Sequence, residues 1–220
     1  MLKYFQLLYF SFYRPKIFFP KKTYSLFKED LFVTKYFKNL DRGFYVDVGC
    51  YHPLEGNNTQ LLYKKGWRGM NFDINAYSID IFNFLRKQDI NIKSGISDKK
   101  NKVKMFYRKK INMLNTIDKS FALKHFRNGF KEKLINVNTL DYFMKKNFKK
   151  PKKIDFLNID VEGDEIKVLK SLNFEKYKPK LICIEIHEKF FKRNKVYKYL
   201  INKKYKIVWN IEYSFIFKRL

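Results

Sequence analysis

Carboxylate and imidazole side chains recur in this sequence directly after short apolar runs. Asp160 and Glu162 stand two residues apart after one such run, and His52 and His187 follow two others. Histidine titrates near neutral pH, so an imidazole beside carboxylates can take a proton from a weakly acidic hydroxyl. We therefore predict His52, Glu162 and His187 as catalytic residues, with packing or helix capping as the alternative for each histidine.

The spacing of Asp160 and Glu162 leaves further roles open. If the chain is still extended there, residues two apart point to the same side, and both carboxylates flank the reacting atoms. If the strand has already ended, Glu162 instead caps the helix that follows. Asp160, Glu162 and His187 also have the ligand types of a divalent-cation site. We expect the site to work without a metal.

A second set of side chains has the spacing of a nucleoside site. Asp47 and Gly49 stand at the end of the apolar run 44–48, and Asp73 follows Gly49 by 24 residues. In nucleotide-binding units an acidic residue about 20 residues after the glycine turn accepts hydrogen bonds from ribose hydroxyls. The chain lacks the further glycines that a pyrophosphate needs, which favours a nucleoside without phosphate. S-adenosylmethionine meets that description; the alternative is that Asp47 and Asp73 only cap helices.

The elements that would position these side chains alternate between strand and helix. Apolar, β-branched runs predict strands at 44–48, 70–72, 90–96, 154–159 and 181–186, and helical spacing predicts helices at 58–65, 78–87, 164–172 and 189–202. Such alternation indicates a parallel sheet with helices on both faces. Two last strands, 205–209 and 211–217, are nearly contiguous and pair antiparallel. We predict a single Rossmann-like α/β domain of the class I methyltransferase fold, mostly parallel, with a C-terminal antiparallel hairpin.

The predicted fold says where a ligand would bind. In an open parallel sheet, ligands lie outside the carboxyl ends of the strands. Polar residues and one glycine stand at four of these ends in the sequence. We therefore predict that the cofactor is bound by Asp47, Gly49, Asp73, Ser97, Asp98 and Asp160.

The remaining segments are less regular. Residues 1–40 form an aromatic and basic extension before the domain at 41–220, and we expect residues 1–20 to pack on the core, with weak peripheral membrane contact as the alternative. Strands at 102–108 and 134–137 and a helix at 139–146 are predicted, whereas 109–133 is polar and gives no clear pattern. No run approaches the roughly 20 apolar residues of a spanning helix.

Two stretches together resemble a known family. The run YVDVGCYHP at 45–53, the later LYKKGWRG at 62–69 and DIN at 73–75, and the second run IDFLNIDVEG at 154–163 are similar to the hallmarks of FkbM-type methyltransferases. The segment GISD at 95–98 is similar as well. The resemblance covers roughly 44–188 and implies S-adenosylmethionine-dependent O-methylation, often of sugars or secondary metabolites. Many members carry Ala or Asn at the position of Cys50, and Pro at that of Ala76; neither change removes a polar cofactor contact.

The amino-acid composition narrows the classes of binding partner and the cellular compartment that we expect. The chain carries 48 Lys and Arg against 21 Asp and Glu, a net charge of +27, but 40 of the basic residues are Lys and only eight are Arg. Proteins that bind phosphate groups specifically tend to use Arg, and the lysines here are scattered along the chain. Biased codon usage therefore explains the positive charge better than nucleic-acid binding does. Two cysteines and no metal-binding cysteine motif indicate a reducing compartment, and we expect a cytoplasmic protein.

The predicted function is therefore methylation of a hydroxyl on a glycan or similar small-molecule acceptor, with S-adenosylmethionine as cofactor and no specific nucleic-acid partner. Two alternatives stay open. One is a basic nucleic-acid-binding module that uses the net charge of +27. The other is an inactive methyltransferase-fold scaffold.

Overall fold

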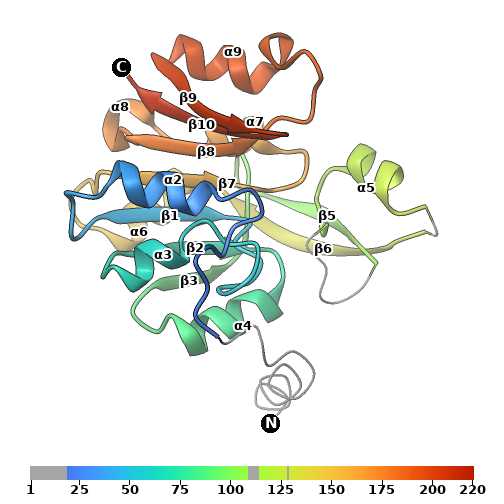
Figure 1. Ribbon diagram of the computed structural model, residues 1–220. Helices are drawn as coiled ribbons and strands as arrows, with labels where there is room; N and C mark the ends of the chain where they lie inside the picture. Colours follow the sequence, from blue (N-terminus) through green and yellow to red (C-terminus); the bar gives the residue numbers. More distant parts are fainter. Residues whose placement is uncertain (1–18, 109–113, 128) are drawn as a thin grey trace.

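A seven-stranded sheet forms the centre of the computed structural model, which describes residues 19–108, 114–127 and 129–220. Its strands are β1 Phe44–Val48, β2 Arg68–Asp73, β3 Ile90–Lys93, β7 Phe156–Ile159, β8 Leu181–Glu185, β9 Tyr205–Ile211 and β10 Ser214–Arg219. They lie in the order β3-β2-β1-β7-β8-β10-β9. The first five are mutually parallel, and β10 is antiparallel to both β8 and β9. The predicted fold class is confirmed (Figure 1).

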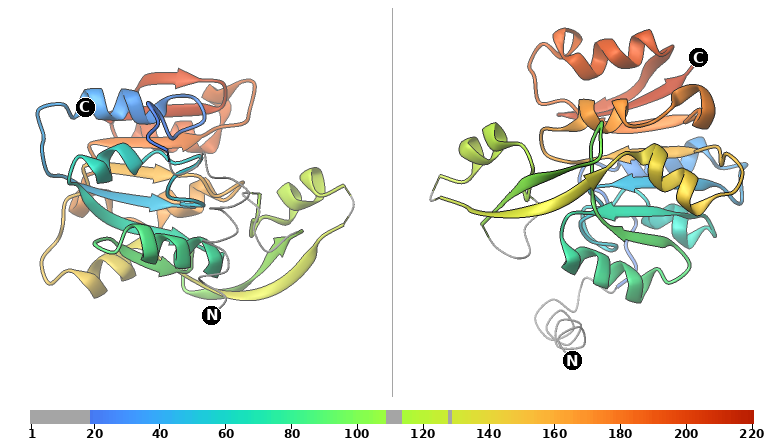
Figure 2. Two further views of the ribbon diagram at one scale, coloured as in Figure 1. Left: turned by 60° about the horizontal axis from the view of Figure 1, so that its bottom comes forward. Right: turned by 180° about the vertical axis from the view of Figure 1, so that it is seen from behind.

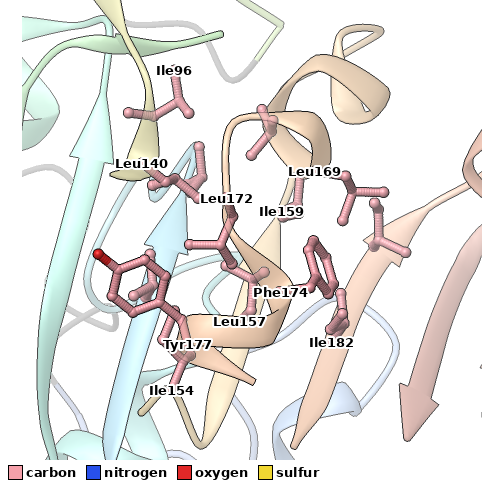
Figure 3. Close-up of a cluster of buried hydrophobic side chains, with 14 of the residues drawn as sticks. Ile96, Leu140, Ile154, Leu157, Ile159, Leu169, Leu172, Phe174, Tyr177 and Ile182 are labelled. Carbon is pink, nitrogen blue, oxygen red and sulfur yellow. The ribbon is translucent and has the colours of Figure 1, made fainter. Parts of the chain in front are cut away.

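Helices cover both faces of this sheet (Figures 1 and 2). One face carries α2 Glu29–Tyr36, α3 Gln60–Lys64 and α4 Ala76–Leu85; the other carries α6 Leu140–Asn147, α7 Glu165–Lys170, α8 Phe174–Tyr177 and α9 Lys195–Asn202. Successive side chains of a strand point to opposite faces, so each inner strand contributes to both cores. In β7, Phe156 joins the core under α2, whereas Leu157 and Ile159 join the larger core. Figure 3 shows these two side chains beside Leu169 and Leu172.

Helix starts follow local capping. The side chains of Asn75, Thr139 and Asn194 accept hydrogen bonds from backbone N–H groups at the starts of α4, α6 and α9. Such caps satisfy donors that have no partner within the helix. The helix predicted at 189–202 begins later for this reason: a short 3₁₀ helix, Phe191–Arg193, precedes the cap at Asn194.

The single strand predicted at 90–96 is wrong, because the chain changes sheet at Ser94. Strand β3 ends at Lys93 in the main sheet, where the Ser94 N–H donates to the Asp73 carbonyl at 3.0 Å. The next two residues, β4 Gly95–Ile96, pair with β6 Lys131–Asn138 in a second sheet of three strands. This crossing places Ser94 beside the carboxyl end of β2.

The second sheet continues into a projecting arm. Strand β5 Asn101–Tyr107 pairs antiparallel with β6, and α5 Lys119–His125 lies between them in the chain. Figure 1 shows the arm extending from the side of the main sheet toward which the parallel strands run. Helix α5 falls in the stretch that gave no clear sequence pattern; Asp118 caps it by accepting from the Ser120 and Phe121 N–H groups.

The described part of the N-terminal extension joins the domain core. Val33 and Phe37 are buried in one cluster with Trp67, and the Phe37 and Trp67 rings meet edge to face at 4.9 Å. The expectation for residues 1–20 lies almost wholly outside the described residues, which begin at Phe19. Among the helices that are described, none has the length and apolar character needed to cross a membrane.

Candidate active site

A cavity opens at the carboxyl ends of β1, β2 and β7. Three of the predicted cofactor residues line it: Gly49, Asp73 and Asp160. The sheet order explains this convergence, since β1 lies between β2 and β7.

Gly49 allows the ends of β1 and β7 to meet. Its φ is +82°, a backbone angle that residues with a Cβ rarely adopt. Its N–H donates to the Phe72 carbonyl at 2.9 Å. A Cβ added here would overlap the carbonyl oxygen of Asp160. The glycine therefore lets the backbone of Asp160 reach the cavity wall.

Asp73 presents a fixed carboxylate to the cavity. One oxygen accepts from the Tyr51 N–H at 2.9 Å and the other from the Asn75 N–H at 2.7 Å. Burial raises the pKa of Asp73 to about 6, although these hydrogen bonds oppose the shift. The Ser78 side chain also hydrogen-bonds this carboxylate, and the acceptor capacity that remains can serve ligand hydroxyls.

The structure does not bring Asp47 to the cavity. Asp47 lies in β1 with its side chain on the face covered by α3, where it is fully buried. Its carboxylate accepts from Thr59 Oγ1 and Asn158 Nδ2, both at 2.9 Å. The buried guanidinium of Arg86 donates to Thr59 Oγ1 at 2.7 Å. Asp47 thus belongs to a buried polar network that joins α3 to the sheet.

Ser97 and Asp98 also lie outside the cavity lining. Ser97 is buried after β4, where its N–H donates to the Asn138 carbonyl at 3.0 Å. Asp98 is exposed. The change of sheet at Ser94 is the reason, because the residues that follow it run away with the second sheet. Ser94 and Gly95 line the cavity instead.

Sequence reasoning also missed Asn115, Ile117 and Asp164, which complete the far wall. The first two belong to the arm, in the stretch that gave no clear pattern. Asp164 stands at the N-cap position of α7, and the sequence assigned it only to the start of a helix. No local signal places these residues at one cavity, since their approach depends on the arm folding back on the β7 end.

Glu162, Glu185 and His187 form a cluster near the turn that follows β7, although none of the three lines the cavity. Their ligand atoms all lie within 4.8 Å of one another, a spacing that could hold a divalent cation. His187 Nε2 is 3.1 Å from a Glu185 oxygen, and its ring lies against Tyr213 at 4.6 Å between centroids. The hydrogen bond to Glu185 raises the pKa of His187.

The carboxylates of this region repel one another. Burial and then the Glu185 charge raise the pKa of Glu162 to about 8. Burial, followed by the charges of Glu185 and Glu162, raises the pKa of Asp160 well above its usual range. A positively charged ligand would be stabilised beside such a group of carboxylates.

The chain is not extended from Asp160 to Glu162, so alternation along a strand does not explain how the two carboxylates meet. Strand β7 ends at Ile159, and Glu162 has a φ of +58°. Thr116 Oγ1 of the arm donates to the Glu162 carbonyl at 2.7 Å and holds this turn. A left-handed turn at a residue other than glycine is costly and often marks a functional site.

His52 lies apart from the other two predicted catalytic residues. It is buried, and its Nδ1 accepts from the Leu54 N–H at 3.1 Å. It lines neither the cavity nor the neighbouring pocket described next. The structure therefore brings together Glu162 and His187, but not His52.

A second, smaller pocket meets the cavity at Asp160, which lines both. Amide, hydroxyl and carboxylate groups dominate its polar lining: Glu29, Asn58, Asn158, Asp160, Glu185 and Ser214. No Lys or Arg of residues 19–108, 114–127 or 129–220 lines it. This lining disfavours an anionic group.

The sheet order with its inserted antiparallel strand, and a ligand cavity at the strand ends, define a class I methyltransferase fold. The family described as "Methyltransferase FkbM domain" matches residues 47–207. The chain belongs to this family, as its sequence runs indicated. No curated protein matches the chain.

Among solved structures, the chain is similar to one from Clostridium thermocellum that carries the provisional description of an rRNA methylase. The two are 12% identical, with a TM-score of 0.41. The match covers 91% of this chain and all of the other.

Proposed function

We propose that the protein is an S-adenosylmethionine-dependent O-methyltransferase that modifies a hydroxyl of a glycan or a similar neutral metabolite. The observation that carries this proposal is the cavity that joins Gly49, Asp73 and Asp160 at the strand ends. It lies in a chain that belongs to a methyltransferase family. The proposal includes a reducing, cytoplasmic location, in keeping with the free thiols of Cys50 and Cys183.

The groups in the cavity fit this cofactor. Asp73 can accept from the ribose hydroxyls, while Asp160 lies on the opposite wall within a group of carboxylates that favours a cationic ligand. No basic side chain of the described residues lines the cavity, which disfavours a pyrophosphate and suits a ligand with a sulfonium and an ammonium group. When bound, S-adenosylmethionine supplies an electrophilic methyl group.

The acceptor side follows from the pocket that meets the cavity at Asp160. An acceptor there would lie next to the cofactor site, with amide and carboxylate oxygens to receive its hydroxyl protons. Proximity and alignment of the two reactants supply most of the rate increase in such a displacement. The excess of carboxylates opposes a phosphate-rich acceptor at this point.

His187 and Glu162 are the groups that can take the hydroxyl proton. Glu185 and Tyr213 hold the imidazole in place. With a pKa raised to about 8, Glu162 is a stronger base than an ordinary carboxylate once it is ionised, and it must be ionised to take the proton. His187 must be in its neutral form to act as the base.

Calorimetric titration with S-adenosylhomocysteine tests the cofactor assignment. We expect saturable, one-to-one binding that changes little with salt. The absence of binding, together with salt-dependent binding of an oligonucleotide, would instead support the nucleic-acid module. Transfer of a labelled methyl group to a panel of neutral glycans then distinguishes an enzyme from an inactive scaffold, which would bind the cofactor product without turnover.

A further inference from the structure

Two buried acceptor atoms in the cavity wall have no hydrogen-bond partner among the described residues. They are Asn115 Oδ1 and Asp164 Oδ2, and both residues line the cavity. A buried polar atom without a partner costs roughly 1–3 kcal/mol. Most such atoms in folded proteins are satisfied, so two in one cavity indicate ligand groups that would complete them.

The carboxylate of Asp164 has no capping role that would explain its position. Asp164 is only 4% exposed and stands at the N-cap of α7, yet its side chain makes no cap hydrogen bond. Its Oδ1 pairs with Lys167 Nζ at 2.6 Å, which leaves Oδ2 free. This oxygen can accept a hydrogen bond from a ligand.

Asn115 reaches the same wall because the arm packs on the turn after β7. Thr116 Oγ1 donates to the Glu162 carbonyl at 2.7 Å. A Cβ added to Gly163 would lie 3.0 Å from Asp118, which shows how closely the two segments approach. Asn115 and Asp164 are therefore held on adjoining segments of one wall.

The cavity next to these two polar atoms is apolar. Ile74 and Ile96 line it from the main and second sheets, and Ile117 and Val161 line it from the arm and the β7 turn. Aliphatic side chains of this kind suit a flat ring such as a purine. Asp73, adjacent to Ile74 in the chain, stands where the sugar of that nucleoside would lie.

We propose that Asn115 and Asp164 recognise the 6-amino edge of the adenine ring, so that the arm is part of the cofactor site. This inference rests on the proposed function. The Asn115 amide offers one acceptor and one donor, which match the 6-amino group and an adjacent ring nitrogen of adenine. Asp164 Oδ2 accepts from the 6-amino group. Hypoxanthine carries a carbonyl oxygen in place of the 6-amino group. This oxygen would face the Asp164 carboxylate, and two acceptors without a hydrogen between them repel each other.

The test compares S-adenosylhomocysteine with its inosine analogue, S-inosylhomocysteine, by calorimetry. The unmodified protein should prefer the adenosine ligand by roughly tenfold or more, since a buried polar group left unpaired is penalised strongly. Asn115→Ala should weaken binding of the adenosine ligand and reduce the preference. Asp164→Asn should reduce or reverse the preference, because its amide can donate to the oxygen at position 6.

Asp41→Asn is the matched control, since Asp41 is an exposed carboxylate that does not line the cavity. It should leave both dissociation constants unchanged, and thermal melting of each variant shows that it is folded. Equal binding of the two ligands by the unmodified protein would overturn the inference while leaving the proposed function intact. An unchanged preference in both folded variants would do the same. Failure of both ligands to bind would overturn the proposed function together with the inference.

Discussion

At the scale of single residues, the site is a group of carboxylates that resist ionisation. Glu162 has a pKa of about 8, and that of Asp160 is raised well above its usual range by burial and by the charges of Glu185 and Glu162. The mutual electrostatic repulsion of these carboxylates is reduced when a cationic ligand binds beside them. The local group of carboxylates therefore supports a cofactor with a positively charged sulfonium, whereas the net positive charge of the chain does not.

Replacing Glu162 by Gln should lower turnover on an acceptor identified from the glycan panel by about tenfold or more, which is the scale of acid–base contributions. The dissociation constant for S-adenosylhomocysteine should stay within about twofold, a pattern that marks a group acting in the transition state. Glu175→Gln is the control, because Glu175 is an exposed carboxylate that lines neither the cavity nor the adjoining pocket. Unchanged turnover in the Glu162 variant would remove Glu162 from the mechanism.

The same variant should change how stability depends on pH. The folded chain holds a proton on Glu162 up to about pH 8, whereas the side chain ordinarily titrates near 4.5. Between these values the folded state binds more protons than the unfolded state, so this residue makes stability fall as pH rises. The melting temperature of Glu162→Gln relative to the unmodified protein should therefore increase from pH 5 to pH 8. An equal difference at both pH values would contradict the raised pKa.

The sequence could place Gly49, Asp73 and Asp160 because each directly follows a short apolar strand. It could not exclude Asp47, since a strand pattern does not reveal that a polar network will surround an inward side chain. Arg86 was missed for the same reason: at the end of a predicted helix it resembles a surface residue, yet it is 1% exposed.

At the scale of elements, the close approach of the segments that follow β1 and β7 depends on Gly49. Gly49→Ala adds a Cβ that overlaps the Asp160 carbonyl, and it also places alanine at a φ of +82°. Gly66→Ala is the matched control, since Gly66 has a φ of +99° but nothing within 4 Å of an added Cβ. Both variants carry backbone strain of about 1 kcal/mol, and only the first adds a collision of roughly 1–3 kcal/mol.

Thermal melting should therefore show a larger loss for Gly49→Ala, by about 2–4 °C for each additional kcal/mol. Binding of S-adenosylhomocysteine should weaken in this variant and stay unchanged in Gly66→Ala. Equal losses of melting temperature in the two variants would show that strain alone, and not the close approach to Asp160, explains the glycine.

Most elements could be predicted because their periodicity is local, as in β1 and β8. The strand at 90–96 could not be divided correctly, because the break at Ser94 comes from pairing of Gly95 and Ile96 with β6, some 40 residues later. Helix α5 was missed because its seven residues give only a weak apolar pattern, although Asp118 and Ser120 carry a cap signal.

At the scale of the whole molecule, charge is divided between a basic surface and an acidic site. The chain carries a net charge of +27, yet no basic residue of the described chain lines the cavity or the pocket that meets it at Asp160. The lysines Lys93, Lys102 and Lys133 line a separate pocket, which shares Ser94 and Gly95 with the cavity. A neutral acceptor would enter such a site without help from the surface lysines. The basic surface should bind polyanions only weakly and in a salt-dependent manner.

Replacing Lys102, Lys131 and Lys133 of the arm by Gln tests this separation, since all three are exposed. The triple variant should retain turnover and its affinity for S-adenosylhomocysteine within about twofold, while the affinity for an oligonucleotide falls and depends less on salt. A tenfold loss of turnover would mean that the acceptor is a polyanion held by the arm.

We infer that Asp73 binds the ribose of an adenosine cofactor. Calorimetric titration of the unmodified protein and of Asp73→Ala with S-adenosylhomocysteine tests it most directly. Hydrogen bonds to a charged group contribute roughly 1.5–3 kcal/mol, so the variant should bind about ten- to a hundredfold more weakly while remaining folded. An unchanged dissociation constant in a folded Asp73→Ala variant would contradict the account.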